Sequence, residues 1–124
     1  MAAPDPMTSR DPAMFLSDMV EFCSLVMQYT SGFDLAALLA DRMRYDATLR
    51  NIELIGEAAS RVPEALRMQA PEIAWRQVVG TRNRVAHAYL TLDAGTLWLV
   101  ITDSIPRLHA QLLAFQARIA GAPG

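Results

Sequence analysis

Apolar residues recur every three or four positions along most of the chain, which is the spacing of amphipathic α-helices. No segment alternates apolar and polar residues over the length of a strand. Alanine, leucine and methionine dominate the composition, and all three are strong helix formers. The pattern therefore predicts an all-α fold, an antiparallel up-and-down helical bundle with short connections.

Capping and helix-breaking residues divide this pattern into four main helices. The expected helices cover about residues 11–29, 34–61, 73–88 and 93–120. Asp11 before a proline is a typical helix start, and Gly32 is a typical left-handed end. Pro63 to Pro71 is a connector with room for one short helix, and Pro106 should kink or split the last helix. Residues 1–9 lack periodicity and are expected to form a disordered tail, followed by a single domain over 10–120.

The length of 124 residues suits one domain, and an apolar content of 52% is enough for one core. No apolar run approaches the roughly 20 residues of a membrane span, and no signal-peptide pattern is present. Cys23 is the only cysteine, so an internal disulfide and a cysteine-built zinc site are excluded. We therefore expect a cytoplasmic protein with no membrane association. The surplus of apolar residues in a small chain also suggests a buried partner face.

The net charge of −2 argues against a general electrostatic attraction to nucleic acid, so any such binding needs a local basic patch. One segment offers it, because residues 73–92 contain no acidic residue, three arginines and His87. On a helical wheel the apolar positions of this segment share one face with Arg82 at its centre, while Arg84 points away. Those apolar positions are Trp75, Val78, Val79, Ala86 and Tyr89. Asn83 and His87 lie one turn apart at the edge of this face.

Each candidate residue also has a purely structural interpretation. Arg82 on an apolar face needs a partner or a cleft, and the structural alternative is a buried ion pair with Glu53 or Glu57. His87 could be a structural hydrogen-bonding residue, and Tyr89 could pack its ring while its hydroxyl stays in water.

The other candidates for special roles are weaker. His109 has no carboxylate or cysteine at ligand spacing, so no metal site is expected there. Cys23 should behave as a small core residue. Gly56, on the inner stripe of the second helix, suggests close approach of another helix. That stripe comprises Leu38, Tyr45, Leu49, Ile52, Gly56 and Ala59.

Three segments in order resemble one protein family. Residues 82–89 match the Arg-x4-His-x-Tyr motif of HEPN-domain toxins of the HepT type. Residues 52–59, Ile-Glu-Leu-Ile-Gly-Glu-Ala-Ala, resemble the E-x-I-G-E-A stretch of that family. Residues 71–76 resemble its P-x-I-x-W-R segment, and Leu97-Trp98 resembles the start of its last helix. The resemblance extends over about residues 10–113.

This resemblance implies a HEPN bundle that forms a homodimer and acts as a metal-independent ribonuclease without a cofactor. It implies a toxin of a type II/VII-like toxin–antitoxin pair, whose partner is a minimal nucleotidyltransferase antitoxin (MNT) that attaches AMP to Tyr89. Arg82 and His87 would be catalytic, assisted by Asn83, since histidine suits proton transfer and arginine binds phosphate in a bidentate manner. The alternative is a non-catalytic helical subunit that binds the nucleotidyltransferase and serves as its substrate.

Overall fold

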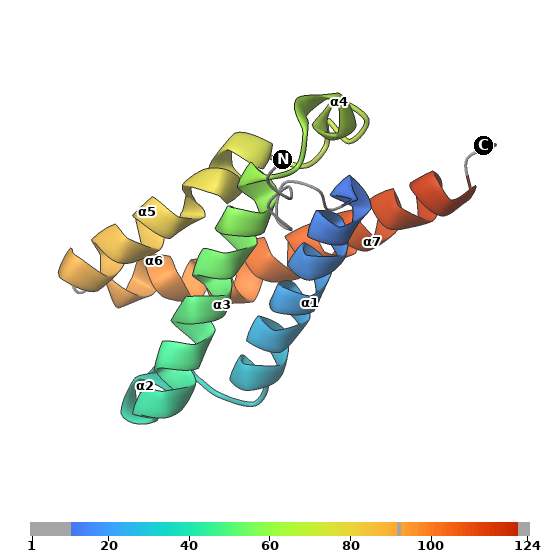
Figure 1. Ribbon diagram of the computed structural model, residues 1–124. Coiled ribbons are helices and arrows are strands. Elements are labelled where there is room, and N and C mark those ends of the chain that lie inside the picture. The colour runs from blue at the N-terminus through green and yellow to red at the C-terminus, as the bar shows by residue number, and fades with distance from the viewer. Residues whose placement is uncertain (1–10, 92, 122–124) are drawn as a thin grey trace, which may run out of the picture.

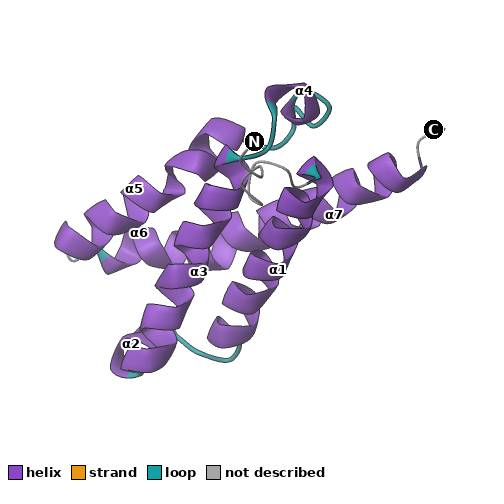
Figure 2. Ribbon diagram, in the orientation of Figure 1, coloured by secondary structure: helices purple, strands orange, loops and turns teal. Residues whose placement is uncertain are grey.

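The computed structural model describes residues 11–91 and 93–121, except for the side chain of Tyr89. This part of the chain contains helices and no strands (Figures 1 and 2). The elements in order are α1 (Pro12–Thr30), α2 (Leu35–Ala40), α3 (Arg42–Ser60), α4 (Glu64–Arg67), α5 (Trp75–Thr91), α6 (Ala94–Leu99), the π-helical turn η1 (Val100–Ser104) and α7 (Ile105–Gly121). The predicted all-α fold is confirmed, with α4 as the short connector helix. The expected tail over residues 1–9 lies outside the described residues.

The long helices pack as an antiparallel bundle with α3 between α1 and α5 (Figure 1). α1 and α3 run side by side in opposite directions, and the α6–η1–α7 segment crosses behind them in this view. Short links join consecutive helices, which favours this up-and-down arrangement. None of the helices that the structure describes combines the length and the apolar character needed to cross a bilayer.

The centre of the bundle is filled by side chains of α1, α3 and α7. Its most deeply buried members include Leu16, Met19, Cys23, Val26, Ile52, Ile55, Leu112 and Phe115. Each fully buried side chain of this kind stabilises the fold by roughly 1.5–3 kcal/mol. Cys23 is fully buried, and burial raises its thiol pKa to about 12. It therefore stays protonated and acts as a small core residue, as predicted.

The first helix begins and ends as the sequence predicts. The carboxylate of Asp11 accepts a hydrogen bond from the backbone N–H of Ala13 at 2.9 Å. After Thr30 the chain turns at Gly32, whose φ of +78° lies in the left-handed region that favours glycine. The chain then enters α2 through Asp34, whose side chain accepts from the N–H of Ala37 at 2.8 Å.

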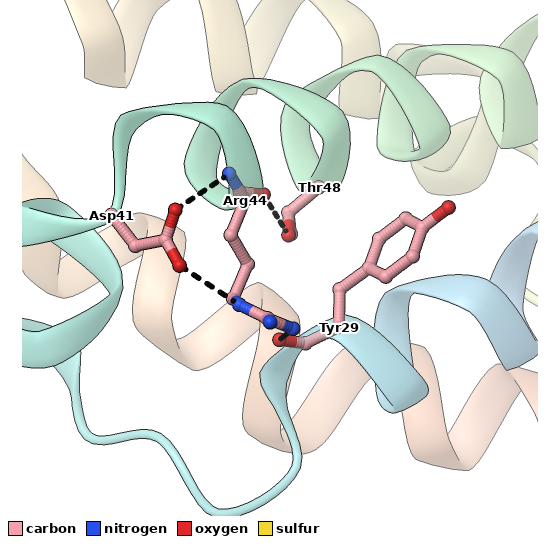
Figure 3. Close-up of polar contacts among 4 residues, drawn as sticks. All are labelled: Tyr29, Asp41, Arg44 and Thr48. Atoms are coloured by element: carbon pink, nitrogen blue, oxygen red, sulfur yellow. Dashed lines mark hydrogen bonds and ion pairs between the residues drawn. The ribbon is translucent and has the colours of Figure 1, made fainter.

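The prediction of one continuous helix over residues 34–61 is wrong, because the chain breaks at Asp41 and forms α2 and α3. The backbone of Asp41 is non-helical, with φ −100° and ψ 88°, and its carboxylate accepts from the N–H of Arg44 at 3.1 Å. The Arg44 guanidinium bonds the same carboxylate at 3.2 Å and the carbonyl of Tyr29 at 2.9 Å (Figure 3). Leu38 and Tyr45, seven positions apart, keep the same helical phase across this point, so only the capping chemistry of Asp41 marks the break.

The last expected helix is interrupted where proline predicts it. The N–H of Ile105 donates to the carbonyl of Val100, which is the i→i+5 bond of a π-helical turn. This turn ends at Ser104, two residues before Pro106, which has no N–H to donate. Asp93 caps the start of α6, as its type and position suggest, by accepting from the N–H of Thr96 at 3.2 Å.

Candidate active site on α5 and α3

The helix that carries the sequence motif, α5, is anchored at its first residue. The Trp75 indole Nε1 donates to the carbonyl of Ala70 at 3.0 Å. Its ring meets Phe115 edge-on with 6.5 Å between centroids, and the Arg67 guanidinium lies 5.9 Å from the ring centroid. These contacts fix the start of α5 against the connector and against α7.

The buried face of α5 differs from the predicted one. Besides Trp75, the buried side chains are Thr81, Val85 and Ala88. Ala86 is exposed, so the wheel prediction is rotated by roughly one residue position, about 100°. Thr81 can lie on this buried face because its hydroxyl donates to the carbonyl of Gln77 at 2.9 Å. A polar residue that bonds its own helix can face the core, whereas an alanine can face water with little loss.

Arg82 is therefore not centred on a buried face, and its side chain is 63% exposed. Its Nη1 lies 3.9 Å from Oε1 of Glu57, which is 46% exposed. The structural alternative predicted a buried ion pair with Glu53 or Glu57. Glu57 is indeed the partner of Arg82, but the pair is exposed and not buried. Glu53 instead pairs with Arg50 at 3.4 Å. An exposed pair contributes little stability, at most about 1 kcal/mol, so burial of the pair does not explain Arg82.

The contact between Glu57 and Arg82 depends on how closely α3 approaches α5. A Cβ built on Gly56 would lie 3.3 Å from the carbonyl oxygen of Val78 and 3.4 Å from that of Val79. Only glycine allows this spacing without a shift of one helix. The predicted close approach at Gly56 is thus confirmed, and it places the next residue, Glu57, beside Arg82.

A pocket of about 230 Å³ opens between these two helices at this point. It is lined by Gly56, Glu57, Ser60, Val79, Arg82 and Asn83. The structure therefore brings two of the candidate residues, Arg82 and Asn83, to one pocket with a carboxylate. Ser60 was not predicted, although its position one turn after Gly56 places it on the same helix face.

His87 lies one turn beyond this pocket and does not line it. The axial separation between His87 and Arg82 is about 7.5 Å from the helical rise. The imidazole is exposed and makes no hydrogen bond to any residue of the described part, so its structural alternative has no support there. Tyr89 belongs to α5, but its side chain lies outside the described residues.

The pKa of the Asp93 carboxyl group is affected by the charge of His87. Hydrogen bonds from Thr96 lower the pKa of Asp93, and the charge of His87 lowers it further.

Among residues 11–91 and 93–121, no group of three or more potential ligands is placed to hold a metal ion. His109, on α7, is thus not part of any such group.

A second, larger groove of about 440 Å³ lies between α3 and the C-terminal half of α5. It is lined by Asp46, Leu49, Arg50, Glu53, Val85, Ala86 and Leu90. Leu90, at its edge, is 79% exposed. Large exposed apolar side chains beside a groove are typical of an interaction surface.

Comparison with known proteins identifies the family of this chain. A family described as "Ribonuclease HepT-like" matches residues 19–115. "Probable ribonuclease HepT" of Thermococcus cleftensis is 32% identical over 97 residues, which cover 78% of this chain and 88% of that protein. "Putative RNase MJ1380" of Methanocaldococcus jannaschii is 29% identical over 106 residues, which cover 86% of this chain and 97% of that protein. No solved structure matches the chain. The chain belongs to the HepT-like ribonuclease family.

Proposed function

We propose that this protein is a toxin that cleaves RNA without a metal ion, using Arg82, Asn83 and His87. The observation that carries this proposal is the exposed imidazole of His87, which bonds no residue of the described part of the chain and lies one turn from a pocket that contains Arg82 and Asn83. No residue of this set has a packing role that would explain its type. RNA as the substrate class follows from the family to which the chain belongs.

The chemistry requires a base for the ribose 2′-hydroxyl, an acid for the leaving 5′-oxygen and a cation for the charged phosphorus centre. Imidazole can serve as base or acid, because its unperturbed pKa of about 6.5 lies near operating pH. The Arg82 guanidinium can hold two phosphate oxygens through its planar fork. Asn83 can orient the imidazole of His87, one turn away, or donate to the phosphate.

One chain supplies one such histidine, and Arg82 and His87 face different sides of α5. We propose that two copies of the chain meet with their α5 helices at the two-fold axis, so that each motif faces its own copy. The arginine pocket of one protomer and the histidine of its partner then share a cleft. The groove beside Leu90 supplies the apolar surface that such a contact would bury.

Cleavage by the purified protein in the presence of EDTA tests the catalytic proposal. The wild type should cut RNA with the chelator present, and His87→Ala should lose about 10²–10⁴-fold in rate. Arg82→Lys should also be poor, because an ammonium cannot form the planar fork. Loss of activity on chelation, or full activity of His87→Ala, would contradict the assignment. Absence of cleavage in every preparation would favour the non-catalytic alternative.

Sedimentation at micromolar concentration tests the dimer. The expected mass is about twice 13.7 kDa. Leu90→Glu should shift the equilibrium to monomer and reduce cleavage, because the charge would be buried at the interface. Leu113→Glu places the same charge on α7, where Leu113 is 45% exposed, and serves as the matched control. A wild-type monomer at this concentration would remove the composite site.

We further propose that a partner nucleotidyltransferase neutralises the toxin by attaching AMP to Tyr89. The wheel position of Tyr89 lies within about 20° of Arg82, so an attached phosphate would compete for the same guanidinium. Intact mass after co-expression with a cognate nucleotidyltransferase should show AMP-sized increments on the wild type and none on Tyr89→Phe. Increments that persist in Tyr89→Phe would place the modification elsewhere.

A further inference from the structure

The outward face of α5 carries a stripe of residues. The proposed reaction uses only Asn83 and His87, at its C-terminal end. This stripe, spaced at helical intervals, comprises Arg76, Gly80, Asn83, Arg84 and His87. Its four side chains other than Gly80 are all exposed, whereas the opposite side of the helix is buried. No acidic residue occurs anywhere in α5. The stripe is therefore a locally cationic surface on a chain whose net charge is −2.

Two arginines of this stripe differ from most arginines of the molecule. The arginines that pair with a carboxylate are Arg42, Arg44, Arg50, Arg82, Arg107 and Arg118. Within residues 11–91 and 93–121, Arg76 and Arg84 make no ion pair, a property that they share with Arg61 and Arg67. Arg67 instead bonds backbone carbonyls, so its role is structural. Arg76 and Arg84 thus keep their full charge available to an external anion.

Gly80 lies midway between these two arginines, one turn from each, and packing does not explain it. A Cβ at Gly80 would meet no atom within 4 Å, whereas a Cβ at Gly56 would lie in tight contact with α5, 3.3 Å from the carbonyl oxygen of Val78. The φ of Gly80 is not positive, since Gly32 is the positive-φ glycine of the described residues. Glycine inside a helix is less stable than alanine, and its usual justification is the close approach of another chain or a ligand. This open side lies in the N-terminal half of α5, about 15 Å along the axis from Leu90 and the groove where we place the second copy, so the space is available to a ligand.

We infer that the outward face of α5 binds the RNA strand beyond the cleaved phosphate, with Arg76 and Arg84 on backbone phosphates and Gly80 admitting the strand close to the helix. This inference rests on the proposed function, because the stripe ends at His87. The distance along the axis from Arg76 to His87 is about 16 Å, which spans several nucleotides. A regular row of cations with a bare backbone between them suits a phosphate–sugar strand, which repeats its charge at regular intervals.

Binding of a single-stranded RNA to proteins that carry His87→Ala tests this inference without cleavage. In that background, Arg76→Gln and Arg84→Gln should each weaken binding about 3–10-fold and lower the slope of log affinity against log salt by about 0.7. Arg76→Lys should keep the slope, because an ammonium still releases a counterion. Gln28→Glu changes the net charge equally on α1, far from this face, and should change neither quantity.

Gly80 provides the sharper test, because its two effects should have opposite signs. Gly80→Ala and Gly80→Gln should raise Tm by about 2–4 °C through helix propensity. Both should weaken RNA binding, and the longer glutamine should weaken it more. Unchanged RNA binding in the Gly80 variants and in Arg76→Gln would overturn the inference, even if His87-dependent cleavage is found. Weakened binding without any cleavage would support the inference and contradict the proposed catalysis.

Discussion

The two sides of α5 differ in how closely other parts of the chain pack against them. The inward side meets α3 so closely that Gly56 is required for the contact, and it buries Trp75, Thr81 and Val85. The outward side leaves Arg76, Asn83 and His87 in solvent, and a Cβ on its own glycine, Gly80, would touch nothing. One glycine therefore serves packing, and the other has no packing role.

The inward side therefore contributes to stability, and the outward side is the one on which we place the proposed activity. Buried apolar contacts on the inward side stabilise the bundle, and their loss is expressed as unfolding. Exposed polar residues on the outward side contribute almost nothing to stability, so their substitution should leave the fold intact. Variants on the two sides should therefore separate cleanly into stability effects and activity effects.

The largest expected effect is on the inward side, at the anchor of α5. Trp75→Ala removes a buried indole that bonds Ala70 and contacts Phe115, and should lower the free energy of unfolding by about 3–5 kcal/mol. Urea unfolding followed by circular dichroism measures it. His87→Ala is the matched outward variant and should stay within about 0.5 kcal/mol of the wild type. Similar losses for both variants would break the comparison.

The second expected effect compares the same substitution at two glycines. Gly56→Ala should lower the free energy of unfolding by about 1–2 kcal/mol, because the new methyl meets rigid backbone oxygens of α5 at 3.3 Å and 3.4 Å. This is the net loss that remains after a gain in helix propensity of about 1 kcal/mol. Gly80→Ala should change stability in the opposite direction. Equal signs for the two variants in urea unfolding would contradict the structural distinction between these glycines.

The helix content, the caps at Asp11 and Asp93 and the close approach at Gly56 could all be predicted from the sequence. These features depend on local chemistry that a residue and its neighbours specify. The break at Asp41 could not be predicted from periodicity, because its apolar spacing continues and only a competing cap ends the helix. Sequence spacing describes the helix surface but not the strength of a single capping interaction.

The sequence could name candidate site residues but could not predict their geometry. The motif identifies Arg82, Asn83 and His87, yet the wheel placed Arg82 on a buried face that the structure exposes. The error arose at Thr81, which buries itself by bonding Gln77. Orientation of a helix depends on tertiary contacts, here those of Gly56, and these cannot be deduced from one helix alone.

The third prediction concerns Glu57, which touches Arg82 across the boundary between the two sides. Glu57→Gln removes a charge that orients the guanidinium but also one that repels phosphate. We expect kcat to fall about 3–5-fold, equivalent to about 1 kcal/mol, while KM does not rise. Steady-state cleavage of a short RNA measures both constants. Ser60→Ala, in the same pocket without a charge, is the control. A higher KM with unchanged kcat would show that Glu57 does not position Arg82.

The smallest expected effect lies where α5 ends, at Asp93. Its carboxylate accepts from the N–H and the hydroxyl of Thr96, and its own N–H donates to the carbonyl of Ala88. Asp93→Ala should lower Tm by about 2–4 °C at pH 7 through loss of the cap, whereas Asp93→Asn, which keeps an accepting oxygen without the charge, should lower it by a smaller amount. Because the hydrogen bonds of Thr96 lower the pKa of Asp93 in the folded state, the carboxylate stabilises the fold fully above its ordinary pKa of 3.8. That contribution is lost as the pH falls through the lowered folded-state pKa.

The Tm gap between wild type and Asp93→Ala should therefore be constant from about pH 5 to 7 and should shrink below about pH 4. Thermal melts across this range measure it, and a gap that persists undiminished at pH 2 would mean that the charge of Asp93 does not stabilise the end of α5.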